Sequence, residues 1–553
     1  MKLRVLLICL SCLIWASAFA VPAKRERCIL TLSDGSKIEA VWMGDESFHF
    51  YKTDDGRFLQ CDEADIAHFI TQETVTRKLE NVRRKRKEVR AKRNMGRRKR
   101  AGEMTGSKRG LVILVQFPDV PFLLDPDIFQ HFFNDFGYQD DINIGSVRDY
   151  YREASYGQFD FSFDVVGPIM MKDSLRHYGG NNANGDDVHP AEMVIEAVKE
   201  ADSKVDFSQY DWDGDGKVEQ IFIVHSGYDE AQSRRLNDIW SHAWYLSEAL
   251  EEGDGDGPVT VDGVVVDSYA TGAELRGKND AYITGIGTAC HEFAHQFGLP
   301  DFYDTKGNNF GMSTWSLMDY GEYNGGGGVP AGFTSYERMF CGWLSPTELT
   351  YPLSVRNMSA ITSAPECYII RNSGKADEYY LLENRQKEGW DECLDGHGML
   401  ILHVDYDSTA WADNTVNTVR SHQRMTLIPA DNILYIGTLS GDPWPGSRGR
   451  TELTSESIPA ATLFHPNAEG DLFMNHSITE ITESADGLIS FIFDEKALGI
   501  DRLTPFGENS GEGLHQGEAG GALWSVDGRR WRQPEGGLPH GIYITNGKKV
   551  LIR

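Results

Sequence analysis

Apolar and polar residues alternate in short runs through residues 28–70. Two such runs are Ala40–Met43 and Phe48–Tyr51, and Asp-Gly pairs separate the runs. A period of two is typical of half-buried strands, and Asp-Gly pairs favour tight turns. The pattern predicts a small β-meander, which we assign to a β-rich segment over residues 21–76.

Longer apolar patterns begin after residue 108. The continuous run Leu111–Phe117 predicts a strand buried on both faces, and Gln220–His225 predicts a second strand. Helices are predicted over Ser146–Tyr156 and Thr334–Cys341. Helices over a mixed sheet predict an α/β domain, with bounds of about 108–344.

The remainder of the chain has mostly β patterns. Residues 345–498 contain strand-like runs such as Tyr379–Glu383 and Met399–Val404, which predict a β-rich, sandwich-like region. In the tail, residues 499–553, Asn546-Gly547 stands between two runs of β-forming residues and predicts a hairpin.

The first 20 residues have the pattern of a secretory signal peptide. Lys2 and Arg4 precede an apolar run, and the segment ends in Ala18-Phe19-Ala20, a pattern typical of a cleavage site. The competing interpretation is an uncleaved membrane anchor, for which the run is short. We expect a secreted or cell-surface protein.

Charge is unevenly distributed along the 553 residues. The formal net charge is −29, yet residues 1–107 carry 22 Lys and Arg against 14 Asp and Glu. An acidic body argues against nucleic-acid binding. Fourteen of the 24 residues from Arg77 to Arg100 are basic, which predicts an exposed linker over residues 77–107 that an activating protease cuts.

The segment from His291 to Asp301 carries the strongest chemical signal. His291 and His295 lie four residues apart, so on a helix both imidazoles reach one metal ion. Glu292 is placed to reach a water molecule at the metal and to act as general base. Gly298 can end the helix and bring Asp301 round as the third ligand, leaving a fourth position open, as a catalytic zinc site requires.

Two alternatives to this ligand set remain. Asp304 is a rival third ligand, although the glycine spacing favours Asp301. A helix that carries two histidines without binding a metal is the plain alternative for the short motif.

A second segment, Trp315–Gly321, makes the zinc motif more specific. Met318 lies in an apolar run and resembles the methionine turn that lies beneath the metal in metzincin peptidases. Tyr320 follows two residues later and could stabilise an oxyanion.

Several further segments complete a family resemblance, which covers roughly residues 108–495. The chain resembles the immune inhibitor A-type metallopeptidases, peptidase family M6, and most closely their secreted bacteroidete members. The matching segments are Gly110–Phe117, Ser146–Gly157, Asp211–Gly216, Ile239–His242, Glu337–Arg338, Gly342–Leu344 and Tyr379–Gln386.

This resemblance implies a metzincin-like zinc endopeptidase domain with an N-terminal β-rich prodomain and a C-terminal β-rich extension. It implies one catalytic zinc ion, protein or peptide substrates, and no cofactor other than metals, and we expect a monomer. The tail resembles the sorting modules of type IX secretion substrates, with a plain terminal β-cap as the alternative.

An acidic loop is a candidate calcium site. Asp211, Asp213 and Asp215 alternate before Gly216, which is the clustering of oxygen ligands that calcium needs. The loop departs from an EF-hand, and Glu219 could supply the further carboxylate. An Asp/Gly-rich turn without an ion is the alternative.

Six cysteines follow the expected signal peptide. An even number in an exported chain suggests disulfides, and pairing within each region suggests Cys28–Cys61, Cys290–Cys341 and Cys367–Cys393, with free thiols as the alternative. Cys61 is also a candidate latency ligand for the zinc in a precursor, as are Asp62 and Asp65.

The rival to a latent zinc endopeptidase is a non-catalytic adhesin or binding protein with a degenerate peptidase domain. The intact Glu292 argues against it, because a purely structural metal site does not need that carboxylate.

Overall fold

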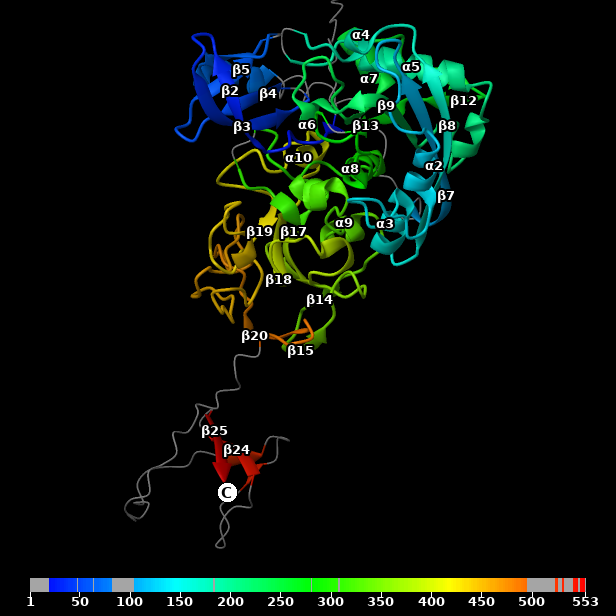
Figure 1. Cartoon of the computed structure of the whole chain (residues 1–553). Helices are drawn as coiled ribbons and strands as arrows, with labels where there is room; N and C mark the ends of the chain where they lie inside the picture. The colour runs from blue at the N-terminus through cyan, green and yellow to red at the C-terminus, as the bar shows by residue number, and fades with distance from the viewer. Residues whose placement is uncertain are drawn as a thin grey trace, which may run out of the picture.

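A computed structural model describes most of the chain between residues 19 and 494 and four strands of the tail (Figure 1). Residues 47, 63, 82–103, 183–184, 280 and 307–308 lie outside the described part. So do residues 1–18 and, apart from the tail strands, everything after residue 494. Most of the expected signal peptide and of the basic linker therefore falls outside the described residues.

The N-terminal strands close into a barrel rather than an open meander. Its strands are β2 (Arg27–Leu32), β3 (Lys37–Asp45), β4 (Phe48–Lys52), β5 (Phe58–Cys61) and β6 (Ile66–Ile70). Closure comes from a parallel pairing of β2 with β6, which local sequence patterns do not reveal. Trp42 and Leu59 share a buried core with Trp240, so the barrel packs against the middle of the chain. A helix over residues 72–81 follows.

A mixed six-stranded sheet forms the centre of the molecule, with strand order β1-β10-β13-β9-β7-β8. Its members are β1 (Phe19–Ala20), β7 (Gly106–Gln116), β8 (Phe159–Met170), β9 (Ile221–Tyr228), β10 (His242–Tyr245) and β13 (Ser268–Leu275). Strands β8, β7, β9 and β13 are parallel, whereas β10 is antiparallel to both β13 and β1. A separate ladder joins β11 (Val259–Val261) to β12 (Val264–Val266).

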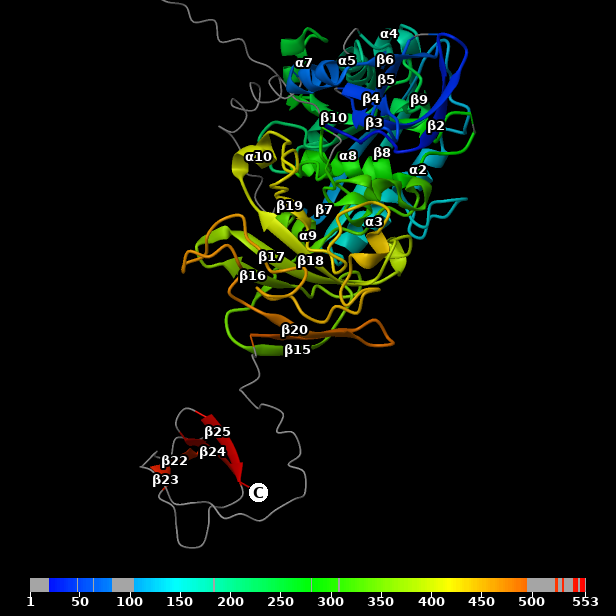
Figure 2. The same ribbon diagram turned by 90° about the vertical axis from the view of Figure 1, so that its left-hand side faces the viewer.

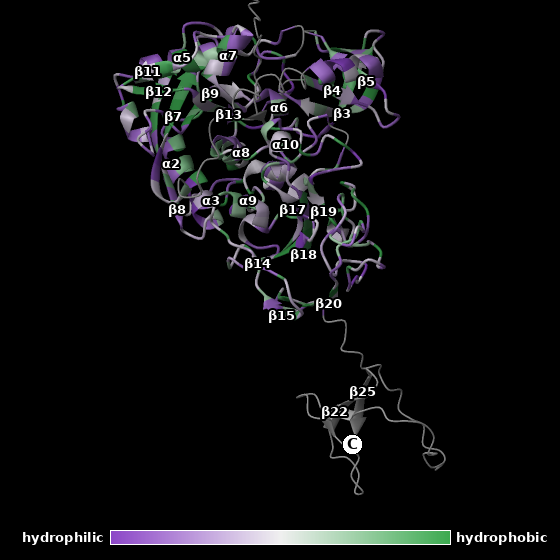
Figure 3. Ribbon diagram, turned by 180° about the vertical axis from the view of Figure 1, so that it is seen from behind, coloured by the Kyte–Doolittle hydropathy of each residue, from purple (hydrophilic) through white to green (hydrophobic). Residues whose placement is uncertain are grey.

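Helices cover both faces of this sheet. The helices are α2 (Ile128–Asn134), α3 (Val147–Ala154), α4 (Leu175–Gly179), α5 (Pro190–Ala201), α6 (Glu230–Ser233), α7 (Leu246–Glu252), α8 (Ile286–Phe297), α9 (Ser335–Phe340) and α10 (Ser408–Ala412). Val112 and Leu114 of β7 join a core with α2, α3 and α8, whereas Leu111 and Ile113 join a core with α4, α5 and α7. Burial on both faces explains why the run is continuously apolar, and Figure 3 shows the central strands in hydrophobic colours.

Two sheets follow in the C-terminal region (Figure 2). The larger contains β14 (Thr347–Glu348), β16 (Tyr368–Asn372), β17 (Lys375–Arg385), β18 (Gly398–Asp405) and β19 (Met425–Leu427); the smaller contains β15 (Leu353–Met358), β20 (Ile478–Glu483) and β21 (Ile489–Phe493). Tyr380 and Phe491 belong to a core that the two sheets share. Leu381 and Leu402 belong to the core of α8, so one continuous core crosses residue 344.

Short 3₁₀ helices and the tail strands complete the fold. The 3₁₀ helices are η2 (Phe207–Tyr210), η3 (Ser313–Trp315), η4 (Tyr320–Gly327), η5 (Gly389–Asp391) and η6 (Leu439–Gly441); the tail strands are β22 (Leu523–Ser525), β23 (Arg530–Trp531), β24 (Gly541–Thr545) and β25 (Lys548–Ile552). Thr545 of β24 pairs with Lys548 of β25, the antiparallel arrangement expected around Asn546-Gly547. Among the described residues, no helix has both the length and the apolar character needed to span a bilayer.

The disulfide prediction is wrong. The structure holds the six described cysteines as free thiols: Cys28, Cys61, Cys290, Cys341, Cys367 and Cys393. Cys28 and Cys61 lie on β2 and β5, which are not neighbours in the barrel. Cys367 is buried while Cys393 is exposed. An even count of cysteines carries no information about these distances.

Candidate metal centre and cleft

Helix α8 packs against strand β13 of the central sheet, and every residue of the helix is buried. Its first turn lies against η4, and a Cβ atom at Gly287 would lie 2.0 Å from the carbonyl oxygen of Glu322. Gly298 ends the helix in the left-handed region with φ +103° and turns the chain back. The helix carries His291 and His295 on one face, as their spacing predicts.

Three side chains converge at this point. The Nε2 atoms of His291 and His295 lie 3.0 Å apart, and Oδ1 of Asp301 lies 3.2 Å from each. Ligands at 2.0–2.2 Å around a tetrahedral ion are separated by about 3.3–3.5 Å. The three atoms are thus spaced like one face of a tetrahedral metal site. Asp304 is not in the cluster, because its two carboxylate oxygens accept the amides of Lys306 and Asn309.

The Nδ1 proton of each imidazole is engaged in a hydrogen bond to a backbone carbonyl oxygen. Nδ1 of His291 donates to the carbonyl oxygen of Leu317, and Nδ1 of His295 donates to that of Leu299, each at 2.8 Å. In the neutral tautomers this leaves both Nε2 atoms as lone-pair acceptors facing the Asp301 carboxylate. Three buried acceptors at such distances repel one another unless a cation lies between them. The donor set therefore fits a metal ion.

The third ligand is oriented by a residue far along the chain. Asn414, just beyond α10, accepts the amide of Asp301 through Oδ1 at 2.8 Å, and its Nδ2 donates to Oδ2 of the same aspartate. Nothing in the local sequence around Asn414 marks it as part of the site.

Comparison with known proteins gives a family match for this part of the chain. Residues 99–343 match the family described as immune inhibitor A peptidase M6, catalytic domain. Immune inhibitor A of Bacillus thuringiensis subsp. alesti is 28% identical over 250 residues, which are 39% of this chain and 35% of that protein. The pre-pro-metalloprotease PrtV of Vibrio cholerae (strain M66-2) is 27% identical over 274 residues, 42% of this chain and 29% of that protein.

Residues 99–343 thus match the catalytic domain of peptidase family M6. The chain spans about a third of the length of the curated relatives it matches.

The segment that contains the expected methionine contacts the group formed by His291, His295 and Asp301. Met318 is fully buried, and its carbonyl oxygen accepts the amide of Phe302, the residue after the third ligand, at 2.7 Å. The carbonyl oxygen of the preceding residue, Leu317, accepts the hydrogen bond from Nδ1 of His291. Residues 317–318 therefore contact one ligand, His291, and the neighbour of another, Phe302, through their backbone carbonyl oxygens.

Glu292 follows the first of these ligands, His291, in helix α8. It is fully buried, Oε1 accepts the backbone amide of Val21 at 3.0 Å, and Oε2 has no hydrogen-bond partner among the described residues. Burial raises the pKa of Glu292 well above its usual value, and the carboxylates of Glu322 and Asp301 raise it further. Glu322, fully buried in η4, is an acidic neighbour that no sequence motif indicated.

An N-terminal segment, residues 21–25, packs against the surroundings of Glu292, which the sequence did not indicate. Tyr323 donates to the carbonyl oxygen of Pro22 at 2.8 Å, and the indole of Trp240 donates to that of Val21 at 2.9 Å. The guanidinium of Arg25 lies 4.1 Å from the centre of the Tyr320 ring. Tyr320, the expected oxyanion residue, is thus covered, and burial raises its pKa to about 12.

Cys61, the expected latency ligand, does not join the metal cluster. It lies at the end of β5, packed against the core around Trp240, and burial raises the pKa of its thiol to about 12. Asp62 accepts a hydrogen bond from His68 within the barrel. The residue that touches the cleft is instead Val21, through its backbone.

The acidic loop gathers as expected. Ligand atoms of Asp211, Asp213, Asp215 and Glu219 all lie within 4.8 Å of one another. Asp211 also accepts amides of the loop, including that of Gly216 at 2.9 Å. The oxygen-only donor set suits a hard cation.

Proposed function

We propose that this chain is a zinc-dependent endopeptidase made as a latent precursor. The observation that carries the proposal is the meeting of three lone-pair atoms, from His291, His295 and Asp301, at 3.0–3.2 Å in a fully buried site. Two imidazoles and one carboxylate are a donor set typical of catalytic zinc with an open position.

The chemistry follows from the residues around that position. A zinc ion held there supplies Lewis-acid polarisation of a peptide carbonyl and lowers the pKa of a water molecule. Glu292, whose Oε2 has no hydrogen-bond partner among the described residues, takes the proton from that water and passes it to the leaving amine. Tyr320 donates a hydrogen bond to the oxyanion once Arg25 has left its ring. Met318 packs beneath the ligands.

The cleft is suited to an extended peptide. Strand β10 pairs with only the two residues of β1 on its outer side, where Ala20 lies opposite His242. Peptides commonly bind by adding a strand to such an edge. Residues 19–22 therefore follow the path that we assign to a protein substrate. Removal of the expected signal peptide after Ala20 would leave Val21 and Pro22 on that path, with Val21 against the general base.

This arrangement supplies a latency mechanism. The barrel holds residues 21–25 in place, since Ala23 donates to the carbonyl oxygen of Gly44 at 2.9 Å. Cleavage in the basic linker near Arg98-Lys99-Arg100 or Lys108-Arg109 would free the barrel from the M6 domain and let this segment leave. Removal of a signal peptide after Ala20 would leave a charged α-amino group at Val21, 3.0 Å from Glu292.

The calcium ion, the export route and the tail remain parts of the proposal. The loop at residues 211–219 supports a structural calcium site by its donor set. Export rests on the sequence of residues 1–20, and a type IX sorting role for residues 499–553 rests on resemblance.

The test uses the protein cut after the basic run, with casein as substrate. Replacement of the general base in Glu292→Gln should lower the hydrolysis rate by about 10²–10⁴-fold while zinc content stays at one equivalent in the cluster. Glu251→Gln, a change in helix α7, serves as the matched control. Full activity in Glu292→Gln, or activity that survives removal of zinc by phenanthroline, would refute the proposal.

A further inference from the structure

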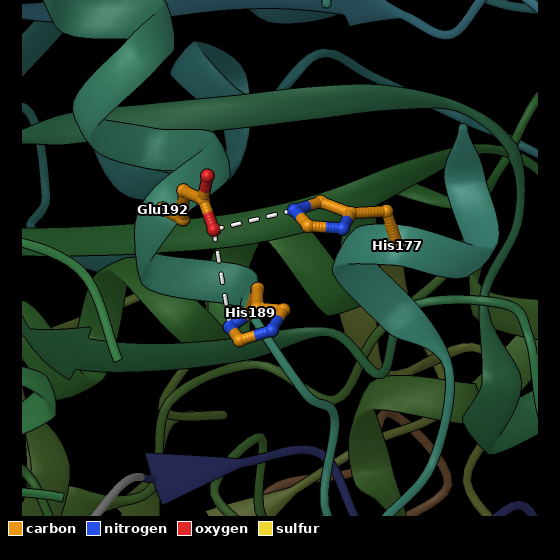
Figure 4. Close-up of side chains that lie close together, drawn as sticks. All are labelled: His177, His189 and Glu192. Atoms are coloured by element: carbon orange, nitrogen blue, oxygen red, sulfur yellow. Dashed lines mark hydrogen bonds and ion pairs between the residues drawn. The ribbon is translucent and has the colours of Figure 1, made fainter. Parts of the chain in front are cut away.

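A second group of side chains of metal-ligating types, separate from the cluster at His291, is drawn in Figure 4. His177 is in α4, His189 is the residue before α5, and Glu192 is in the first turn of α5. Oε2 of Glu192 lies 3.2 Å from Nε2 of His177 and 3.9 Å from Nδ1 of His189. Both imidazoles therefore turn a ring nitrogen toward one carboxylate oxygen.

Asp254 brings a fourth donor from another part of the chain. It follows α7 and is 6% exposed, and its Oδ1 lies 3.6 Å from Nδ1 of His189. Its Oδ2 accepts the amide of Ala191, but Oδ1 has no hydrogen-bond partner among the described residues. A buried carboxylate oxygen thus lies beside His189 with no hydrogen-bond partner among the described residues. Burial raises the pKa of Asp254 because it disfavours the ionised carboxylate. A nearby cation would stabilise that ionised form.

The charges around the group favour a cation. Among the described residues, the ion-pair partners of Glu192 and Asp254 are only these two histidines. Two carboxylates therefore face two imidazoles, and no lysine or arginine pairs with either carboxylate among the described residues. A metal ion would supply the positive charge that the group lacks.

A third cluster in the same molecule provides the contrast. Asp405 accepts hydrogen bonds from His422 and His465, and Lys375 and Arg424 also contact its carboxylate. Two permanent cations already neutralise that site and would repel a metal ion. The similar set at His177 has no such competitor among the described residues.

We propose that His177, His189 and Glu192, with Asp254 beside His189, bind a second transition-metal ion, separate from the peptidase centre. Two imidazoles and two carboxylates are a donor set for zinc, whereas calcium prefers oxygen ligands alone. The distances of 3.2–3.9 Å are within a few tenths of an ångström of the separations of about 3.3–3.5 Å that tetrahedral zinc requires. The side chains of His177, His189 and Glu192 are 34%, 35% and 45% exposed, so they can make this adjustment.

The ion would have a structural role with a link to the cleft. It would join the end of α4 to the start of α5 and to the segment after α7. Asp187, two residues before His189, accepts the amide of Trp240 at 3.0 Å, and Trp240 contacts Val21 in the cleft. A metal at His177 would therefore stabilise the segment that supports the start of β10.

The test counts metal ions in the full chain. The protein is stripped with a chelator, held in excess calcium to fill oxygen-only sites, and titrated with Zn²⁺ or with Co²⁺, whose visible spectrum reports tetrahedral coordination. The wild-type chain should take up two equivalents. His177→Ala and Glu192→Gln should each lower the affinity of one equivalent by at least about 10–100-fold, and His291→Ala should remove the other.

His422→Ala, a change in the cluster with its own cations, should leave the count at two. A count that His177→Ala and Glu192→Gln leave unchanged would overturn the proposal. So would uptake of a single ion that disappears in His291→Ala, or second-site binding only at millimolar metal. Loss of uptake in His291→Ala but not in His177→Ala would contradict the second metal site and leave the proposed peptidase function intact. Failure of one proposal can therefore be told from failure of the other.

Discussion

Asn414 holds Asp301 from two sides, although 113 residues separate them in the chain. Its Oδ1 accepts the amide of Asp301, and its Nδ2 donates to the carboxylate oxygen that does not face the histidines. Asn414 itself has φ +48°, a backbone conformation that asparagine and glycine tolerate best. The β-rich C-terminal region therefore takes part in building the proposed zinc site.

This contact predicts the effect of Asn414→Gly on metal binding. Glycine keeps the positive φ but removes both hydrogen bonds, so Asp301 should lose its orientation. Partners of this kind typically contribute 10–100-fold to metal affinity. Competition with a zinc-chelating dye should therefore show about that loss of affinity. Asn432→Gly, an exposed asparagine at φ +63°, is the control; equal affinity in the two variants would contradict the role of Asn414.

The contact between Arg25 and Tyr320 predicts that the uncleaved precursor gains hydrolytic activity when Arg25 is replaced. In a precursor whose basic run is changed to resist cleavage, Arg25→Ala should raise the rate of casein hydrolysis. A desolvated cation–π contact contributes about 1–2 kcal/mol, which corresponds to about a 5- to 30-fold larger population of the open cleft. The neighbouring Lys24→Ala is the control, because the Lys24 side chain pairs with Glu26. Equal rates in the two variants would show that Arg25 does not close the cleft.

His242 in β10 predicts a dependence of stability on pH. Burial lowers the pKa of His242 to about 4, and its neutral ring donates through Nδ1 to Trp240 and accepts the hydroxyl of Tyr269 through Nε2. Its contribution is fully present above pH 6.5. It is lost as the pH falls towards 4, because only the unfolded chain takes up the proton in that range. The loss amounts to about 3 kcal/mol at most.

Other groups oppose this trend, so a difference measurement is needed. Burial raises the pKa of Asp229 and of Asp238 to about 6, and their protonation on acidification favours the folded state. In His242→Asn, which keeps a donor for Trp240, the free energy of unfolding should fall less between pH 6.5 and 4 than in the wild type. If urea titrations gave the same change in the free energy of unfolding with pH for both proteins, a neutral buried His242 would be ruled out.

The acidic loop predicts stabilisation by calcium. At a calcium concentration about 100 times the Kd, binding adds about 2.7 kcal/mol to the free energy of unfolding. EGTA should therefore lower the melting temperature of the wild type but not that of Asp211→Asn/Glu219→Gln. Asp256→Asn, an exposed change in a second acidic loop, should respond like the wild type. No response of the wild type to EGTA would exclude calcium at this loop.

Local patterns in the sequence were enough for several elements. The continuous apolar run from Leu111 predicted a strand, and β7 buries alternate residues in two cores. The four-residue spacing of His291 and His295 predicted one shared helix face, and Gly298 ends that helix with positive φ. Such features depend on residues within one or two turns of each other, so a single sequence contains the information.

Tertiary structure decided the rest, because it depends on segments that are distant in the chain. The closure of the barrel by β2 and β6 needs residues about 35 apart to pair, and the free cysteines reflect where packing places each thiol. The contact of Val21 with Glu292 spans 271 residues, and that of Asn414 with Asp301 spans 113. A motif identifies side chains that can bind a metal; only the packed fold determines which backbone fills the cleft and which amide orients the ligand.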